Sequence, residues 1–169
     1  MVNAAAQISG CVTVPLDKEL KYGEFEQSLE RCKAKVVFFD KKQEKETKEA
    51  ILSGKTSIEF AFPMYEAEDL ETVTTLLEEG KDLVGEGDVS VDHVQIDPDA
   101  VSMLIFTSGT TSQSKIVMLS QRNICSNVAN MIRIIPFKTT DTNIALLPYH
   151  HMFGSTGQWV MLANGVRTV

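Results

Sequence analysis

The sequence predicts an α/β fold in which helices flank a layered, largely parallel β-sheet. Short runs of β-branched and aromatic residues alternate along the chain with longer segments of helical periodicity. Polar loops follow several of these runs, as they do at the carboxyl ends of strands in parallel sheets. The length of 169 residues suffices for one domain, and the hydrophobic fraction of 43% is ordinary for a globular protein.

The composition argues against several classes of protein. A formal charge of −7 disfavours a nucleic-acid partner, because a polyanion requires a basic surface. Cys11, Cys32 and Cys125 are scattered and form no C-x-x-C pair, which favours reduced thiols over a disulfide framework or a zinc site. No apolar run approaches the roughly 20 residues of a membrane span, and the first residues lack the features of a secretory signal. We therefore expect a cytoplasmic protein without a transmembrane segment.

The amino-terminal half alternates predicted helices and strands. Residues 4–9 are typical of the end of a helix that stops at Gly10, and residues 11–16 form a short β-rich run. Lysine and glutamate alternate in residues 41–52, which predicts a solvated helix with i,i+4 ion pairs. The elements predicted in this half are helices at 22–32, 41–52 and 69–84 and strands at 35–39 and 57–62.

The carboxyl-terminal half continues this alternation after a turn at residues 97–100. Ser120 is a natural N-cap for the helix that follows it, and Asn123 is better explained by satisfying a free N–H of that helix than by ligand binding. Residues 158–162 are expected in the core, and a position on a helix that lines a substrate tunnel is the alternative. The elements predicted in this half are strands at 101–106, 116–119, 143–147 and 166–169 and helices at 120–135 and 154–163.

A polar loop separates the apolar runs 101–106 and 116–120. Its sequence is Thr107-Ser108-Gly109-Thr110-Thr111-Ser112-Gln113-Ser114-Lys115. The hydroxyl groups, the glycine and the lysine provide the donors, the close backbone approach and the positive charge that a phosphate needs. An ordinary polar turn between two hairpin strands is the alternative. A Walker A loop is disfavoured, because Ser114 and Ile116 replace its second glycine and its metal-binding hydroxyl residue.

This loop resembles the phosphate-binding signature of the adenylate-forming enzymes, the superfamily of acyl-CoA synthetases, luciferases and peptide-synthetase adenylation domains. The signature is Thr-Ser-Gly-Thr-Thr-Gly, a short spacer, Pro-Lys-Gly-Val and an apolar run that ends in Ser-His and Asn. The matching positions are Thr107, Ser108, Gly109, Thr110, Thr111, Lys115, Val117, Leu119, Ser120 and Asn123. The departures are Ser112, Ser114, Ile116 and Gln121. A loop with fewer glycines is stiffer, which leaves open how freely it closes over ATP.

A histidine pair lies at the end of the predicted strand 143–147. Adjacent side chains point in different directions, so His150 and His151 rarely bind one metal ion, and a structural role is the alternative to catalysis. The segment 148–154 resembles the second family signature, Pro-Leu-Phe-His-x-x-Gly, and residues 10–16 are similar to the family's Gly-x-x-x-x-Pro-Leu segment. The resemblance implies that His151 lies beside the acyl carboxylate and the AMP phosphate. It places Tyr149 and His150 in the wall of the substrate pocket.

The resemblance implies a reaction in two steps. A carboxylate attacks the α-phosphate of ATP to give acyl-adenylate and pyrophosphate, and the thiol of coenzyme A then displaces AMP. In that scheme residues 108–111 hold the β- and γ-phosphates, Lys115 adds positive charge, and Thr107 is the hydroxyl on the side of Mg²⁺. His151 guides the carboxylate. ATP, Mg²⁺ and coenzyme A are therefore the implied cofactors and co-substrates.

The motifs are most similar to those of bacterial long-chain acyl-CoA synthetases, which implies a fatty acid as the carboxylic acid. The family's adenine-stacking segment Tyr-Gly-x-Thr-Glu and its small mobile domain have no counterpart in the sequence. We therefore expect residues 1–169 to be one partial AMP-binding domain, inactive without the C-terminal domain of the same chain. Two alternatives stay open: a non-catalytic nucleotide-binding or scaffold module, and an adenylating enzyme with a different carboxylate substrate.

Overall fold

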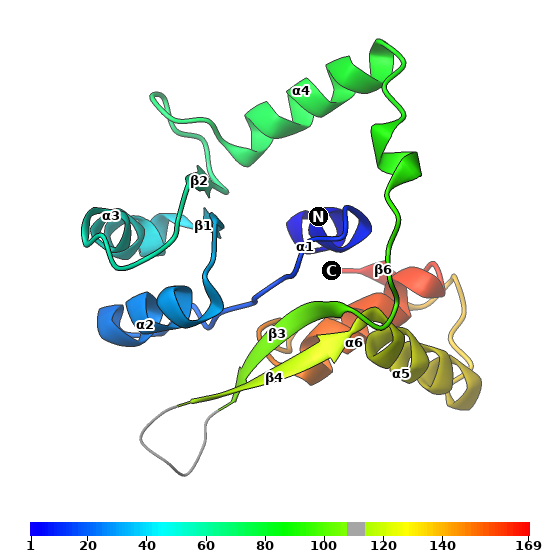
Figure 1. The fold of residues 1–169 in the computed structure, drawn as a ribbon. Helices are drawn as coiled ribbons and strands as arrows, with labels where there is room; N and C mark the ends of the chain where they lie inside the picture. The colour runs from blue at the N-terminus through cyan, green and yellow to red at the C-terminus, as the bar shows by residue number, and fades with distance from the viewer. Residues whose placement is uncertain (108–113) are drawn as a thin grey trace. The chain divides into compact units, whose positions relative to one another are not determined.

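Helices and strands interleave along the whole chain, as Figure 1 shows for the computed structural model. The structure describes residues 1–107 and 114–169. Its strands form three two-stranded sheets, of which two are parallel and one is antiparallel. The α/β class is therefore confirmed. Apart from the first two residues, the chain divides into a unit of residues 3–17 with 95–169 and a unit of residues 18–94.

The unit of residues 18–94 is built around a parallel pair of strands. Its elements are α2 (Tyr22–Cys32), β1 (Val36–Phe39), η1 (Lys41–Gln43), α3 (Glu44–Leu52), β2 (Phe60–Pro63), α4 (Val73–Gly85) and η2 (Ser90–His93). In the parallel pair Val36 lies opposite Phe60 and Phe39 lies opposite Pro63. The buried apolar side chains of this unit include Phe25, Leu29, Val37, Phe39, Ala50 and Pro63. They come from α2, β1, α3 and β2.

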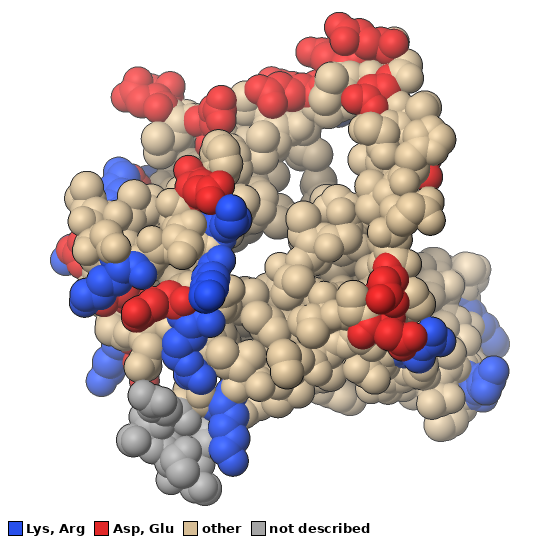
Figure 2. All heavy atoms as spheres, in the orientation of Figure 1, with Lys and Arg blue, Asp and Glu red and all other residues tan. Residues whose placement is uncertain are grey.

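Two helices of this unit, α3 and α4, carry many charged side chains. In α3 the Lys48 ammonium lies 2.5 Å from Glu44, one turn earlier, so the predicted i,i+4 pairing is present. The helix predicted at 69–84 begins only at Val73, because Thr72 is extended and its hydroxyl accepts the N–H of Thr75 as an N-cap. Figure 2 shows acidic side chains gathered along α4.

The unit of residues 3–17 and 95–169 contains the polar loop and the histidine pair. Its elements are α1 (Val2–Ile8), β3 (Val101–Thr107), β4 (Lys115–Ser120), α5 (Gln121–Ile134), β5 (Thr142–Asn143), α6 (Met152–Ala163) and β6 (Arg167–Thr168). Strands β3 and β4 pair antiparallel, so the chain reverses direction between them as it does in a hairpin. Residues 108–113, which lie between these strands in the sequence, are outside the described residues. Strands β5 and β6 are parallel.

Two strands predicted in this unit are mostly absent from the described structure. Of residues 11–16 only Thr13 pairs, in a parallel bridge to Met103, and Pro15 has no N–H to extend that bridge. Of residues 143–147 only Asn143 belongs to a strand, and the ladder with β6 ends where Ala145 donates to Val169 at 2.8 Å. Within the described part of the chain, residues 144–147 belong to no strand.

Helices α5 and α6 are joined by two buried clusters of apolar side chains. One cluster is Met103, Ile105 and Ile124, with Trp159 packed against it. The other is Val160, Met161 and Val166, with Met131, Ile132 and Phe137 packed against it. The core position predicted for 158–162 is thus correct for Val160 and Met161, whereas Leu162 is 57% exposed. No helix within the described ranges is both long enough and apolar enough to cross a membrane.

Candidate functional site

Thr107 is the last residue of β3 and Lys115 is the first residue of β4. They are directly paired in the strand register, and the Thr107 hydroxyl donates to the Lys115 carbonyl oxygen at 3.5 Å. Lys115 is exposed, so its ammonium group is accessible to an anion. The structure therefore brings together two of the residues that the sequence predicts for phosphate binding. The others, Ser108, Gly109, Thr110 and Thr111, lie outside the described residues.

The Thr107 hydroxyl fits the predicted role of binding Mg²⁺ only as one ligand among several. Because it donates its hydrogen to the Lys115 carbonyl, its oxygen lone pairs remain available to a cation. Outside residues 108–113, no group of three or more His, Cys, Asp or Glu residues is arranged to hold a metal ion. Mg²⁺ commonly takes most of its ligands from substrate phosphates and water, so Thr107 would hold it together with phosphate oxygens.

The histidine pair belongs to a turn that is tied to the start of α6. His151 is the N-cap residue of this helix, with φ −91° and ψ 143°. Its N–H donates to Pro148 O at 3.2 Å, and its carbonyl accepts the N–H of Ser155 at 3.0 Å. The Ser155 hydroxyl donates to the Tyr149 carbonyl at 2.5 Å. These contacts fix the backbone of His151 at the positive end of the helix dipole, where a carboxylate or phosphate is favoured.

Gly154 permits this turn to close against the helix. A Cβ atom at this position would lie 2.3 Å from the Pro148 oxygen and 2.9 Å from the Pro148 carbonyl carbon. Both of those atoms are backbone, so no side-chain rotation could relieve the clash. Any larger residue would therefore displace the turn that carries the two histidines.

The imidazole rings of His150 and His151 lie against each other. Their centroids are 4.3 Å apart, and the ring planes are tilted by 44°. The side chain of His150 is 21% exposed, and its Nε2 lies 3.5 Å from the Asp17 carboxylate. His151 and Tyr149 are exposed. Sequence reasoning missed Asp17, because nothing in the local pattern links the amino-terminal segment to the histidine pair.

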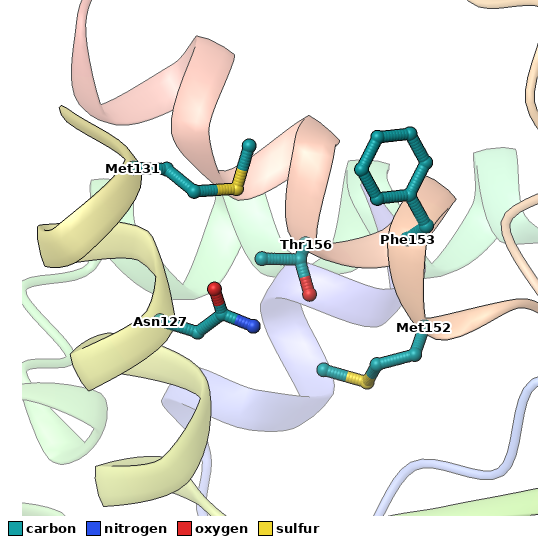
Figure 3. Close-up of a pocket in the computed structure, with 5 residues that line it drawn as sticks. All are labelled: Asn127, Met131, Met152, Phe153 and Thr156. Carbon is teal, nitrogen blue, oxygen red and sulfur yellow. The ribbon is translucent and has the colours of Figure 1, made fainter. Parts of the chain in front are cut away.

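A cavity of about 330 Å³ lies between α5 and α6 (Figure 3). It is lined by Asn127, Met131, Met152, Phe153 and Thr156. Its volume is at the lower end of the range for small-molecule sites. Met152 and Phe153 directly follow the predicted catalytic residue His151 in the sequence, so the cavity is lined by the first turn of the helix that His151 caps.

Two polar side chains reach into this otherwise apolar cavity. Figure 3 shows the Asn127 amide and the Thr156 hydroxyl projecting toward each other from the two helices. Thr156 is only 2% exposed, and its hydroxyl has no hydrogen-bond partner among the described residues. A buried hydroxyl without a partner is costly, which suits a site where a ligand supplies one. Sequence reasoning did not identify these residues, because helical periodicity cannot tell a cavity from a filled core.

Comparisons with known proteins agree with the two sequence motifs. The AMP-binding enzyme family matches residues 1–169. The oxalate–CoA ligase of Arabidopsis thaliana is 30% identical over 146 residues, which are 83% of this chain and 26% of that protein. Long-chain-fatty-acid–CoA ligase 5 of Rattus norvegicus is 39% identical over 72 residues, 40% of this chain and 10% of the relative.

The fold is also similar to that of solved structures. ATP-bound MatB from Rhodopseudomonas palustris superposes with a TM-score of 0.74 at 21% identity. The superposition covers 99% of this chain and 31% of MatB, so the chain spans less than a third of that protein. The family match extends over the whole chain and includes both motifs. The chain therefore belongs to the AMP-binding enzyme family.

Proposed function

We propose that the protein containing this chain is an ATP-dependent acid–thiol ligase, which adenylates a carboxylic acid and transfers the acyl group to coenzyme A. The observation that carries the proposal is the pairing of Thr107 with Lys115 at the ends of β3 and β4, in a member of the AMP-binding enzyme family. The relatives named above are CoA ligases of different acids.

The adenylation step needs oriented donors and positive charge around the phosphates of ATP. In the proposal residues 108–111 hold the β- and γ-phosphates, and Lys115 offsets the charge that develops as pyrophosphate leaves. Thr107 would share Mg²⁺ with the phosphate oxygens, and the bound ion would supply further charge neutralisation there. The thiol of coenzyme A displaces AMP in the second step.

His151 orients the carboxylate in this scheme. Its backbone is held by Pro148 and Ser155, so its ring projects from a fixed point at the amino end of α6. The partial positive charge of the helix terminus favours the two anionic groups that must meet there. Because His151 is held in place, it can align the acid with the α-phosphate, and this alignment lowers the entropic cost of the reaction.

The acid is proposed to be a fatty acid. Met131, Met152 and Phe153 give the cavity beside His151 an apolar lining, which an acyl chain would fill. Asn127 and Thr156 favour a second candidate, a carboxylic acid with a polar group in its tail, because the Thr156 hydroxyl lacks a partner in the part of the chain that the structure describes. A panel of straight-chain, hydroxylated and short dicarboxylic acids distinguishes the two.

The test is ATP–pyrophosphate exchange by the protein that contains this chain, with Mg-ATP and that panel of acids. Lys115→Ala is expected to lower the exchange rate roughly 100-fold, which is typical for the loss of one charge-stabilising group. Its thermal unfolding should stay unchanged, because the Lys115 side chain is exposed. Lys138→Ala, an exposed lysine of the same unit, is the matched control and should exchange normally.

Two outcomes would contradict the proposal. A wild-type protein that binds Mg-ATP without releasing pyrophosphate for any acid would be a scaffold or nucleotide-binding module, which the Ser112, Ser114 and Ile116 departures made an alternative. Unfolding of Lys115→Ala would make this lysine structural.

A further inference from the structure

Asp17 contacts the histidine pair from a segment that is firmly attached to the same unit. Thr13 exchanges backbone hydrogen bonds with β3, donating to Ser102 O and accepting from Leu104 N, both at 2.9 Å. The Gln121 side chain of α5 donates to Gln7 O at 3.0 Å. Residues 7–13 are thus held against β3 and α5, and Asp17 follows four residues later. Its Oδ2 atom lies 3.5 Å from Nε2 of His150.

The chemistry of this contact favours a hydrogen on one particular nitrogen of His150. An ionised carboxylate only accepts hydrogen bonds, so a protonated ring nitrogen facing it is favoured over a bare one. We therefore expect Nε2 of His150, which lies 3.5 Å from Asp17, to carry a hydrogen. The carboxylate thereby favours one orientation of the His150 ring over the flipped one.

The oriented His150 ring in turn limits the ring of His151. The backbone of His151 is fixed by Pro148 and Ser155, so the rotation of its side chain is the freedom that remains. The His150 ring occupies one side of that range, with the centroids 4.3 Å apart. Because Asp17 restrains the His150 ring, that ring reduces the number of rotamers that His151 can adopt. Supporting contacts restrict the side chains of other functional sites in the same way.

We propose that Asp17 is a positioning residue: it holds the His150 ring, and that ring holds His151 in the orientation that receives the carboxylate substrate. The inference rests on the proposed function, because only there does His151 meet a substrate. Asp17 itself acts through His150 and touches neither the acid nor ATP in this scheme.

The first test measures the rings directly in the 169-residue chain by NMR at about pH 8, where an ordinary histidine is neutral. Long-range ¹H–¹⁵N correlations should show His150 protonated at Nε2 in the wild type. Asp17→Ala should give a mixture of tautomers and shift the ring protons of His151. Asp17→Asn, whose amide oxygen can still accept a hydrogen bond, should retain most of the wild-type pattern.

Asp92→Asn, which changes an exposed carboxylate of the other unit, is the control. A His150 ring protonated at Nδ1, or His151 signals unchanged in Asp17→Ala, would overturn the inference.

The second test is kinetic and uses the protein that contains this chain. Asp17→Ala should lower kcat for adenylation roughly tenfold, within the range for a misplaced reacting group, and leave the KM for ATP unchanged. Asp17→Asn should recover most of that loss. Unchanged kcat in Asp17→Ala would refute the positioning role. A wild type without any ligase activity would refute the proposed function instead, while the NMR measurement would still decide whether Asp17 orients the rings.

Discussion

At the scale of single residues, the geometry of the candidate site depends on a glycine, Gly154, which has no side chain. The helix α6 starts so close to Pro148 that only a glycine fits at position 154. At Gly157, one turn later in the same helix, no described atom outside the adjacent residues and the nearby helix backbone lies within 4 Å of the place where a Cβ would be. Gly154 is therefore required by a close backbone contact, whereas Gly157 carries only the ordinary cost of a glycine in a helix. Comparing the two positions distinguishes these effects.

Gly154→Ala is expected to destabilise the chain by about 1–3 kcal/mol, the usual range for overpacking at a site that cannot relax. It should also change the NMR signals of His150 and His151, since the displaced turn carries both rings. Unfolding in urea measures the first effect. Gly157→Ala is the matched control and should be neutral or up to about 1 kcal/mol more stable. Equal stabilities of the two variants would show that Gly154 does not support the turn.

At the scale of elements, α2 is tied to the segment after α3 by a charged network. Lys55 Nζ donates to Glu26 at 3.0 Å, and the Tyr22 hydroxyl donates to the same carboxylate at 2.9 Å. The hydrogen bond from Lys55 is the main cause that lowers the pKa of Glu26, and the same bond raises the pKa of Lys55. The ionised pair is thus favoured in the folded state.

Removing the Glu26 charge should change how stability depends on pH. Because the pKa of Glu26 is lowered on folding, its contribution is present above the ordinary glutamate pKa of about 4.3 and is lost as the pH falls through the lowered value. Wild type should therefore lose more unfolding free energy than Glu26→Gln between pH 6 and pH 2. Urea titrations at several pH values measure this difference. Glu79→Gln, an exposed position in α4, is the control and should follow the wild type. Identical slopes for Glu26→Gln and the wild type would contradict the role of the pair.

The elements themselves were predicted well where the signal is local. Helix α2 has the predicted limits, and Ser120 caps α5 with Asn123, whose side chain accepts the Ser120 N–H at 3.0 Å. Residues 143–147 were predicted as a strand from their apolar composition, yet Leu146 is 82% exposed. A strand needs a partner backbone, and composition does not provide one.

At the scale of the whole molecule, the chain holds part of what the proposed reaction needs. It spans 31% of MatB, and the family's adenine-stacking segment has no counterpart in its sequence. That residues 1–169 form one partial domain stays a prediction. The structure describes two compact units within these residues.

We expect the 169-residue chain alone to show no ATP–pyrophosphate exchange above background, because the groups that would bind adenine and close the site are lacking. The assay uses Mg-ATP and the panel of acids, with the Lys115→Ala chain as the blank. Exchange by the wild-type chain that disappears in the blank would contradict this prediction. It would also show that residues 1–169 suffice to bind and align both substrates.

The sequence by itself determined the α/β class, the helices, and the two motifs that place the chain in its family. These depend on periodicity, caps and residue order, which act over a few neighbouring positions. Only the tertiary structure decided that Asp17 meets His150 and that Asn127 and Thr156 share a cavity. Such contacts join positions far apart in the chain, and they arise from how helices and strands pack, which no local pattern encodes.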